Sequence, residues 1–360
     1  MTTTSLDMDL VERFAGQVFG YYTGGMIAYM IDIGHRTGLF EATAQGPGTA
    51  AELAERAGLH ERYVREWLGS MAVSGIVSYD AATATFTLPA EHAACLTGAG
   101  SRNLARFSQL GTHVGTHVGA VAECFRAGGG VPYEAFRPEF TGVMDAANRN
   151  TFDEHLVTGF LPLVPGLTRR LSEGGRVADV GCGTGHALVM LAREFPASTF
   201  TGYDVAADAI EHARKEAADA GLTNVRFERH DVAALGAGEP FDAVISFDTV
   251  HDLPDPAGFL RAVHRSLAPG GRYLMVEPKT SSNLEDNIGH PMAPLLYAVS
   301  TLHCLTVSLA EGGRRARHRV RRAEGDRAAQ RRRVHRHHGH AGARRSPGRR
   351  VRRHTASGMR

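Results

Sequence analysis

Residues 176–185 read Arg-Val-Ala-Asp-Val-Gly-Cys-Gly-Thr-Gly. The mostly apolar run 177–180 is typical of the end of a short buried strand. The three glycines permit a sharp turn into a helix that begins near His186, and without a Cβ they let a ligand lie almost against the backbone. Such a turn between a parallel strand and a helix is where open α/β sheets bind cofactors. The stretch therefore predicts a cofactor-binding turn.

Strand-like and helix-like segments alternate from Arg176 onward. The intervening helices carry apolar stripes, as in Ile210, Ala213 and Ala217, which are followed by Gly221. This alternation predicts a doubly wound, mostly parallel sheet covered on both faces. We expect strands at 176–180, 199–203, 224–230, 241–247 and 272–277.

Three acidic residues lie at the ends of successive expected strands: Asp179, Asp204 and Asp231. The carboxyl ends of parallel strands share one edge of the sheet, so the three carboxylates should converge on one crevice. Asp204 has the position of a carboxylate that binds both ribose hydroxyls, and Asp231 that of an acceptor for an adenine amino group. Each of the three could instead cap a helix. Their joint placement favours a nucleoside ligand.

NAD is the competing ligand for such a turn. Its fingerprint is GxGxxG, whereas this chain has GxGxG preceded by Asp179. A carboxylate there would repel a diphosphate, but it would attract a sulfonium and an α-amino group. The charges therefore favour S-adenosylmethionine as the cofactor.

Several segments together resemble the successive motifs of a class I S-adenosylmethionine-dependent methyltransferase. They are Asp179-Val-Gly-Cys-Gly-Thr-Gly185, Asp204, His230-Asp231-Val232, Phe241-Asp-Ala-Val-Ile-Ser-Phe247-Asp248 and Pro269-Gly270-Gly271. The resemblance implies a Rossmann-like sheet. It also implies cofactor contacts from Asp179, Gly181, Gly183, Gly185, Asp204, Val205, Asp231, Val232 and Phe247.

The chemistry of a methyltransferase directs attention to His251. Methyl transfer is an in-line displacement at carbon, so the enzyme mainly aligns the acceptor with the methyl group. A hydroxyl acceptor also has to lose its proton. His251 follows the fourth strand in Val-His-Asp-Leu-Pro-Asp. The resemblance to O-methyltransferases with a His-Asp pair after this strand makes His251 the candidate general base, although related enzymes carry this histidine without that role.

Residues 48–88 have the pattern of a winged helix. Thr49 can cap a first helix, a second helix from about Glu61 carries an apolar stripe, and 76–88 read as a β-hairpin. DNA reading by the second helix is one interpretation. That helix balances its two arginines with two glutamates, so we favour dimerisation or a lid over the substrate. With this front part, residues 1–311 resemble an actinobacterial two-domain methyltransferase family, similar in layout to small-molecule O-methyltransferases.

The remaining N-terminal half reads as helical. In 10–45, Tyr21 and Tyr22 could line a pocket, but core or interface packing is favoured. In 96–172, His113 and His117 have the i, i+4 spacing of metal ligands but lack a third ligand, so packing is favoured again. Tyr133, Phe136 and His155 are further pocket candidates, with core packing as the default.

Composition limits the class of protein. The first ten residues lack the features of a signal peptide, and four scattered cysteines fit a reducing cytoplasm without a zinc site. Residues 1–313 carry 22 basic and 36 acidic side chains, which argues against a nucleic-acid surface there. Residues 287–310 contain no Asp, Glu, Lys or Arg, but their prolines and histidines favour buried helices over a membrane span.

The C-terminal tail loses every structural signal. From Arg314 onward there are 18 arginines, no lysine, and no Leu, Ile, Phe, Tyr or Trp. A basic disordered tail that binds acidic partners is one interpretation. We prefer a shift of reading frame in GC-rich DNA. Codons for 316–356 can be chosen so that, read one base later, they give an amphipathic helix, an alternating strand and a final apolar strand.

These observations give one leading hypothesis and one alternative. We expect domains at 1–95 (winged-helix-like), 96–172 (helical connector and substrate cover) and 173–311 (cofactor binding), with a frame-shifted tail at 312–360. We expect a cytoplasmic S-adenosylmethionine-dependent methyltransferase that acts on a small molecule, forms a homodimer, has no metal, and binds neither membrane nor nucleic acid. The alternative is a DNA-binding regulator that uses a methyltransferase-like domain as a ligand sensor.

Overall fold

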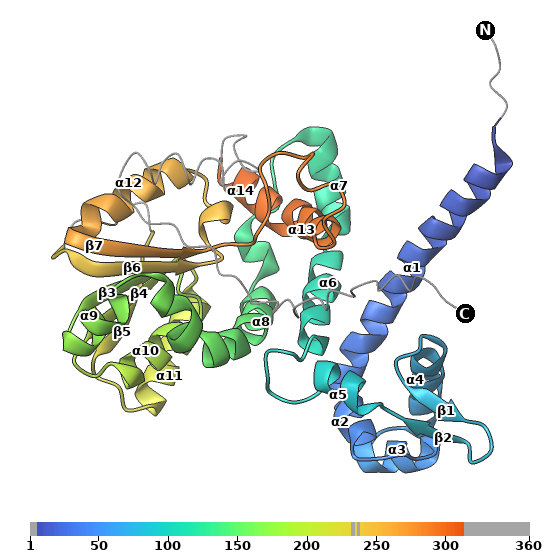
Figure 1. Cartoon of the computed structure of the whole chain (residues 1–360). Helices are drawn as coiled ribbons and strands as arrows, with labels where there is room; N and C mark the ends of the chain where they lie inside the picture. The colour runs from blue at the N-terminus through green and yellow to red at the C-terminus, as the bar shows by residue number, and fades with distance from the viewer. Residues whose placement is uncertain (1–5, 232–234, 236–237, 313–360) are drawn as a thin grey trace, which may run out of the picture.

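The computed structural model describes residues 6–231, 235 and 238–312. Within these residues a helical N-terminal region and a helical connector lead into an α/β domain (Figure 1). Val232 and the segment 313–360 lie outside the described residues. The cofactor contact predicted for Val232 and the frame shift predicted for the tail therefore stay predictions.

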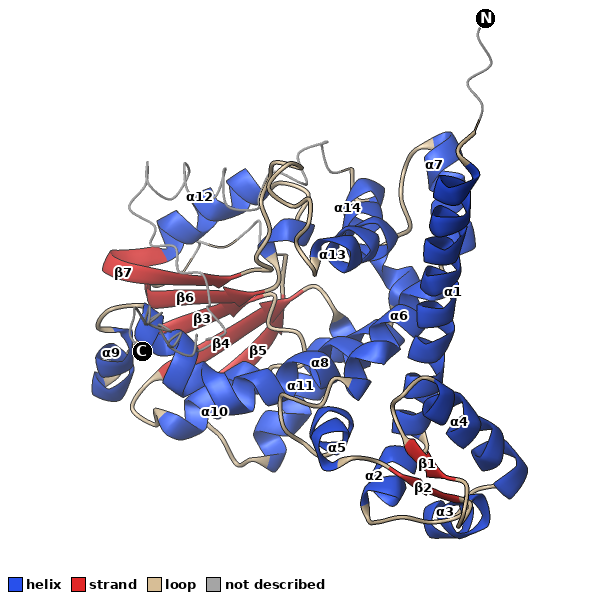
Figure 2. Cartoon of the chain, turned by 45° about the vertical axis from the view of Figure 1, so that its right-hand side comes forward, coloured by secondary structure: helices blue, strands red, loops and turns tan. Residues whose placement is uncertain are grey.

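Five parallel strands form the central sheet in the order β5-β4-β3-β6-β7 (Figure 2). The strands are β3 (Arg176–Val180), β4 (Thr199–Asp204), β5 (Val225–Arg229), β6 (Phe241–Phe247) and β7 (Leu267–Val276). The expected strands are confirmed to within one residue, except that β7 begins five residues earlier. Its first residue pairs with Phe241 before the register shifts and Arg272 pairs with Ala243. The strand order reverses at β3, so the crevice at its carboxyl end is the expected ligand position.

Helices cover both faces of the sheet. On one face, α9 (Leu167–Glu173), α10 (His186–Glu194) and α11 (Ala207–Asp219) share a core with Val177. On the other face, α12 (Pro256–Ser266) packs with Ala178. Successive side chains of a strand point to opposite faces, which is why these two neighbours belong to different cores. The doubly wound, Rossmann-like class is thereby confirmed.

The connector crosses the carboxyl edge of the sheet and contacts the C-terminal helices. Its helices are α5 (Ala90–Leu96), η1 (Ala105–Phe107), α6 (Ser108–Gly115), α7 (Val118–Ala127), η2 (Tyr133–Phe136), α8 (Glu139–His155), η3 (Leu156–Phe160) and η4 (Leu161–Leu163). A short helix, η6 (Val250–Asp252), follows β6. The chain then reaches α13 (Ala293–Val299), η7 (Ser300–Cys304) and α14 (Leu305–Ala310).

The helix from Ala293 to Ala310 is, among the described residues, the one with the length and mean hydropathy of a membrane span. Its buried side is partly polar, because His303, Thr306 and Ser308 are all buried. Thr306 Oγ1 accepts a hydrogen bond of 2.8 Å from the backbone N–H of Val131. This face therefore packs on the connector, as expected for a helix that covers the site.

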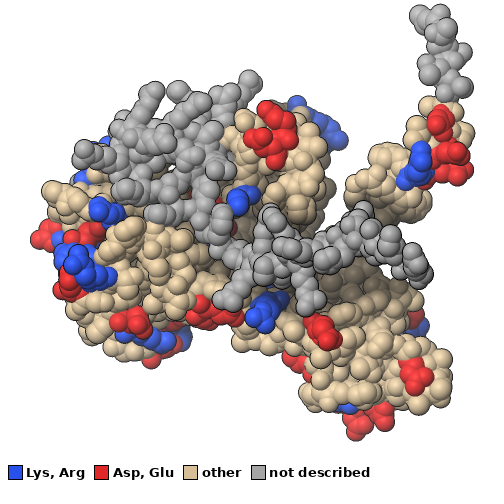
Figure 3. Space-filling view, in the orientation of Figure 1, with Lys and Arg blue, Asp and Glu red and all other residues tan. Residues whose placement is uncertain are grey.

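The N-terminal region contains the winged-helix elements. They are α1 (Met8–Arg36), α2 (Leu39–Ala44), α3 (Ala50–Ala57), α4 (Glu61–Val73), β1 (Ser78–Asp80) and β2 (Thr85–Thr87). Thr49 and Glu52 form a reciprocal capping box at the start of α3, and Trp67 packs edge-on against Phe40 at 5.1 Å. Both arginines of α4 pair with glutamates of the same helix. On the face drawn in Figure 3, this end of the molecule shows acidic side chains and no continuous basic stripe.

Candidate active site

The glycine turn after β3 is open on one side and packed on the other. The side chain of Thr249 lies against Gly181, and Phe227 lies against Gly185, where an added Cβ would come within 2.5 Å of it. No atom lies within 4 Å of the position that a Cβ at Gly183 would take. The turn is therefore held by its flanks, while Gly183 leaves room for a ligand.

Asp179 is a buried carboxylate behind this turn. Its side chain is 2% exposed, and within the described residues its Oδ1 has no hydrogen-bond partner. Burial, and then the charge of Asp204, raise the pKa of Asp179 to about 8. Buried polar atoms are rarely left without partners. An unpartnered carboxylate oxygen in this position fits a cationic ligand group, such as an ammonium or a sulfonium.

Asp204 ends β4 and joins the turn directly. Its Oδ2 accepts a hydrogen bond of 2.8 Å from the N–H of Gly183, and its Oδ1 accepts one of 2.8 Å from the N–H of Ala206. Burial raises the pKa of Asp204. The structure thus brings Asp204 and Asp179 together, close enough for each charge to matter to the ligand.

The other expected cofactor contacts lie farther out or in a different layer. Asp231 follows β5 and is exposed, and the side chain of Val205 is 44% exposed. Phe247 ends β6 between Phe152 and Phe160, with ring centroids 4.9 and 5.8 Å away. Asp231 and Val205 are therefore exposed to solvent, and Phe247 contacts aromatic rings of the connector.

His251 lies on η6 in a cluster of acidic side chains. Its Nδ1 is 2.5 Å from Glu277 Oε2, and its Nε2 is 3.1 Å from Asp252 Oδ1. Glu277 Oε1 also accepts a hydrogen bond of 2.8 Å from the N–H of Val250, which fixes the start of the turn that carries the imidazole. Although burial opposes it, the charges of Asp252 and Glu277 hold the pKa of His251 well above 6.5.

Glu277 and Cys304 were not predicted from the sequence. Glu277 directly follows β7, on the same sheet edge as the three aspartates, so its position was a usable signal. Cys304 bonds to His251 from the C-terminal helix, and no local motif marks it. His251, Asp252 and Cys304 offer ligand atoms within 4.8 Å of one another, as do Asp248, His251 and Glu277. A metal could use this geometry, and the same atoms form the hydrogen bond between His251 and Glu277.

The predicted pair His113 and His117 packs among aromatic rings. The two imidazole centroids are 5.5 Å apart, and His117 lies 4.1 Å from the ring of Phe136, which is fully buried. Packing rather than metal binding is therefore the observed arrangement, and no metal-ligating group of the described residues includes either histidine. Tyr133 borders the same core. Core packing for His155 was wrong, because this side chain at the end of α8 is 53% exposed.

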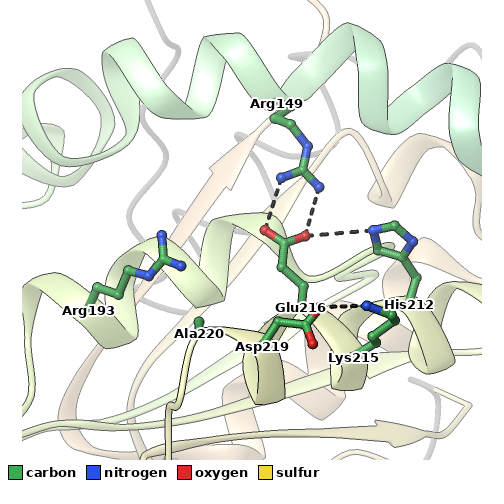
Figure 4. A pocket seen from close by; sticks show the side chains of 7 residues that line it. All are labelled: Arg149, Arg193, His212, Lys215, Glu216, Asp219 and Ala220. Atoms are coloured by element: carbon green, nitrogen blue, oxygen red, sulfur yellow. Dashed lines mark hydrogen bonds and ion pairs between the residues drawn. The ribbon is translucent and has the colours of Figure 1, made fainter.

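A polar network fastens α8 to the glycine turn. Arg149 makes bidentate contacts with Asp145 and Glu216, and Asp145 accepts a hydrogen bond of 2.5 Å from Thr184 within the turn. Figure 4 shows Arg149 reaching from α8 to Glu216 beside a surface cavity of about 340 Å³. Although burial opposes it, hydrogen bonds from Arg149 and His186 lower the pKa of Glu216 to about 2. This cavity is charged and belongs to the outer helices, not to the crevice at Gly183.

Comparisons with known proteins agree with this geometry. A family model described as Rv2258c-like winged HTH domain matches residues 25–98, and one described as methyltransferase domain matches 171–321. A fatty-acid O-methyltransferase of Mycolicibacterium smegmatis is 37% identical over 107 residues, which cover 30% of this chain and 38% of that protein. Aklanonic acid methyltransferase DauC of Streptomyces sp. is 33% identical over 152 residues, which cover 40% and 67%.

The fold is similar to that of human N-acetylserotonin methyltransferase, solved in complex with S-adenosylmethionine. The TM-score is 0.58 at 15% identity, and the match covers 87% of this chain and 93% of that one. Identity at this level shows the fold alone. The chain spans less than half the length of the fatty-acid O-methyltransferase that it matches.

Proposed function

Because the chain belongs to the S-adenosylmethionine-dependent methyltransferases with an N-terminal winged-helix domain, we propose that it methylates a hydroxyl oxygen of a small molecule. S-adenosylmethionine, when bound, supplies an electrophilic methyl group. Asp179 would hold the cationic end of the cofactor and Asp204 its ribose, with Asp231, Val205 and Phe247 as outer contacts. The observation that carries the choice of oxygen is the largely covered pair of His251 and Glu277, whose side chains are 11% and 13% exposed.

His251 would remove the proton of the acceptor hydroxyl. Glu277 holds Nδ1, so we assign the proton to Nε2, the ring nitrogen that lies 3.1 Å from Asp252 Oδ1. The carboxylates of Glu277 and Asp252 stabilise the imidazolium that forms, and this makes the imidazole a stronger base than in water. Burial keeps competing water away from the acceptor oxygen. A base of this kind contributes roughly 10²–10⁴-fold to the rate.

The experiment that tests this proposal measures S-adenosylhomocysteine formation over a panel of hydroxylated acceptors. We expect turnover by the wild-type chain and a loss of roughly 10²–10⁴-fold in His251→Ala, with the affinity for S-adenosylhomocysteine unchanged. His264→Ala is the matched control, because His264 is an exposed histidine on α12. Full turnover by His251→Ala on the true acceptor would show that His251 is not the base.

The same proposal includes a homodimer. In Figure 1 the N-terminal part of α1 extends away from the rest of the described molecule. It exposes large apolar side chains along much of its length: Phe14 at 63%, Phe19 at 69%, Tyr21 at 65%, Tyr22 at 67% and Met26 at 61%. Contiguous exposed apolar surface marks interaction sites. A second copy of this chain is the proposed partner, and the four free cysteines fit the cytoplasm as its location.

The ion pairs on α4 disfavour the DNA-binding alternative. Arg62 pairs with Glu66 and Arg65 with Glu61, so phosphate contact would have to break both pairs. We therefore assign the winged-helix region to assembly and to positioning of the connector.

A further inference from the structure

Two imidazoles close to each other have buried ring nitrogens without partners. His303 is 2% exposed, and its Nε2 has no hydrogen-bond partner within the described residues. His113, from a distant part of the sequence, is partly exposed, but its Nε2 is buried and likewise has no partner there. Buried polar groups in native proteins are nearly always hydrogen-bonded, so two orphans in one cluster require an explanation.

Aromatic rings surround both imidazoles. Phe140 stacks on His303 with centroids 3.8 Å apart and planes at 17°, and Phe136 lies 4.8 Å from the same imidazole. His113 lies 6.0 Å from Phe140 and 6.2 Å from Phe136. These rings come from α6, η2, α8 and η7. Flat faces with a polar atom at the edge suit a planar ligand that carries an oxygen.

The cluster adjoins the proposed base through η7. This segment is a turn of π-helix between α13 and α14, a feature found frequently at functional sites. It presents consecutive residues to the two parts of the site. Cys304 bonds to His251, while His303 is influenced by the charges of Asp252 and His251. An acceptor held at His303 would thus lie near the imidazole that takes its proton.

The electrostatics of this cluster disfavour an anionic acceptor. Burial lowers the pKa of His303 to about 4, so its ring is neutral at neutral pH. Residues 287–310 supply no Lys or Arg, and Arg137, beside Tyr133, is already paired with Asp208. The carboxylates of Asp252 and Glu277 lie close by. A buried carboxylate needs a counter-ion, whereas a hydroxyl or carbonyl needs only a hydrogen bond.

We propose that His113 and His303 form the acceptor subsite, which binds an oxygen of an uncharged, planar, hydroxylated ring compound and discriminates against carboxylic acids. The inference rests on the proposed methyltransferase function and narrows its substrate class. The acceptor lies against the edges of these aromatic rings, and the Nε2 atoms of His303 and His113 satisfy its oxygen.

The test compares 2-naphthol with 2-naphthoate, which share a ring system and differ in charge. Calorimetry first measures S-adenosylhomocysteine binding, and each probe is then titrated into the chain saturated with it. We expect the wild-type chain to bind 2-naphthol at least roughly tenfold more tightly than 2-naphthoate. We expect His303→Phe, which keeps the ring that stacks on Phe140, to lose roughly tenfold in 2-naphthol affinity.

Further variants separate a loss of the hydrogen bond from a loss of the fold. His303→Gln, which keeps a hydrogen-bonding group, should retain more affinity than His303→Phe, and His264→Phe at the exposed surface of α12 should change nothing. If the His303→Phe protein no longer binds S-adenosylhomocysteine, the 2-naphthol titration is made with the His113→Phe protein instead. Equal or tighter binding of 2-naphthoate, binding of neither probe, or unchanged 2-naphthol affinity in the folded variants would overturn the subsite. Failure of the wild-type chain to bind S-adenosylhomocysteine would instead contradict the proposed function itself.

Discussion

His251 shows how a few charges set the working pH of a site. Its pKa is held above 6.5 by Asp252 and Glu277, so the imidazole is protonated below that raised pKa and can accept a proton only above it. We therefore expect the acidic limb of kcat/KM against pH to lie above pH 6.5. Glu277→Gln removes one of the raising charges, so it should move the limb to lower pH and reduce kcat. A pH profile of both proteins checks this.

Two outcomes would count against this account of His251. One is an acidic limb below the ordinary histidine pKa, and the other is a limb that Glu277→Gln leaves in place. Glu228→Gln is the matched control, since Glu228 lies on β5 and pairs with Arg226 at the surface. It should leave the profile unchanged.

Alanine at two glycines of the turn should have different effects, mainly on ligand affinity at Gly183 and mainly on stability at Gly185. Gly183 faces open space with φ +52°, so the methyl group in Gly183→Ala would enter the ligand position. We expect at least roughly tenfold weaker S-adenosylhomocysteine binding with about 1 kcal/mol lost from the free energy of unfolding. In Gly185→Ala the methyl group would meet Phe227, so stability should fall further, by about 1–3 kcal/mol beyond the backbone strain. Calorimetry and denaturant unfolding of both variants separate the effects, and the reverse ranking would contradict them.

Among the elements, the contact between the loop 128–132 and α14 closes the acceptor side of the site. A Cβ on Gly130 would lie 1.8 Å from the carbonyl oxygen of Thr306, so this backbone approach requires glycine. Gly130→Ala should push the loop off the helix, break the bond between Val131 and Thr306, and lower the free energy of unfolding by about 1–3 kcal/mol. Denaturant unfolding gives the value.

The control for Gly130→Ala is Gly119→Ala on α7. No atom lies within 4 Å of a Cβ at Gly119, so alanine there should be neutral or stabilise by about 0.5–1 kcal/mol. Equal effects of the two substitutions would mean that the loop does not depend on this contact.

The sequence predicted the elements whose signals are local. The five strands, the glycine turn, Asp204 and His251 follow from spacing within a short segment. The acceptor side did not follow, because His303 meets Phe140 and Cys304 meets His251 only through the packing of distant helices. Nothing in a single sequence specifies such a contact. Glu277 lies between these cases, since its place after β7 could have been read from the strand pattern.

At the scale of the whole molecule, we predict that two copies of the chain associate through α1. Phe14 and Phe19 are each more than 60% exposed, so replacing both with Asp should remove the apolar surface proposed to join two copies. We expect the wild-type chain to be a dimer and the double variant to dissociate at concentrations at least roughly a hundredfold higher. Light scattering after size exclusion measures this. Tyr63→Asp on α4, where Tyr63 is 80% exposed, is the control. A monomeric wild-type chain would contradict the dimer.

If the tail is frame-shifted, as predicted, β7 is left as an open edge of the sheet. Within the described residues β7 pairs with β6 alone, so its other edge carries unpaired backbone groups. Open edges of this kind promote aggregation. The nucleotide sequence around codons 311–316 tests the frame shift directly, and absence of the alternative reading frame there would remove it.

The central claim is that a cationic nucleoside cofactor binds at the glycine turn with Asp179 behind it. Titration calorimetry with S-adenosylhomocysteine tests it most directly. The pKa of Asp179 is raised to about 8, so its carboxylate becomes charged, and attracts the ligand's ammonium group, as the pH rises toward that value. The account predicts one site per chain, affinity that increases up to about pH 8, and at least roughly tenfold weaker binding with most of that pH dependence gone in Asp179→Asn. No binding, or equal affinity in Asp179→Asn at every pH, would contradict it.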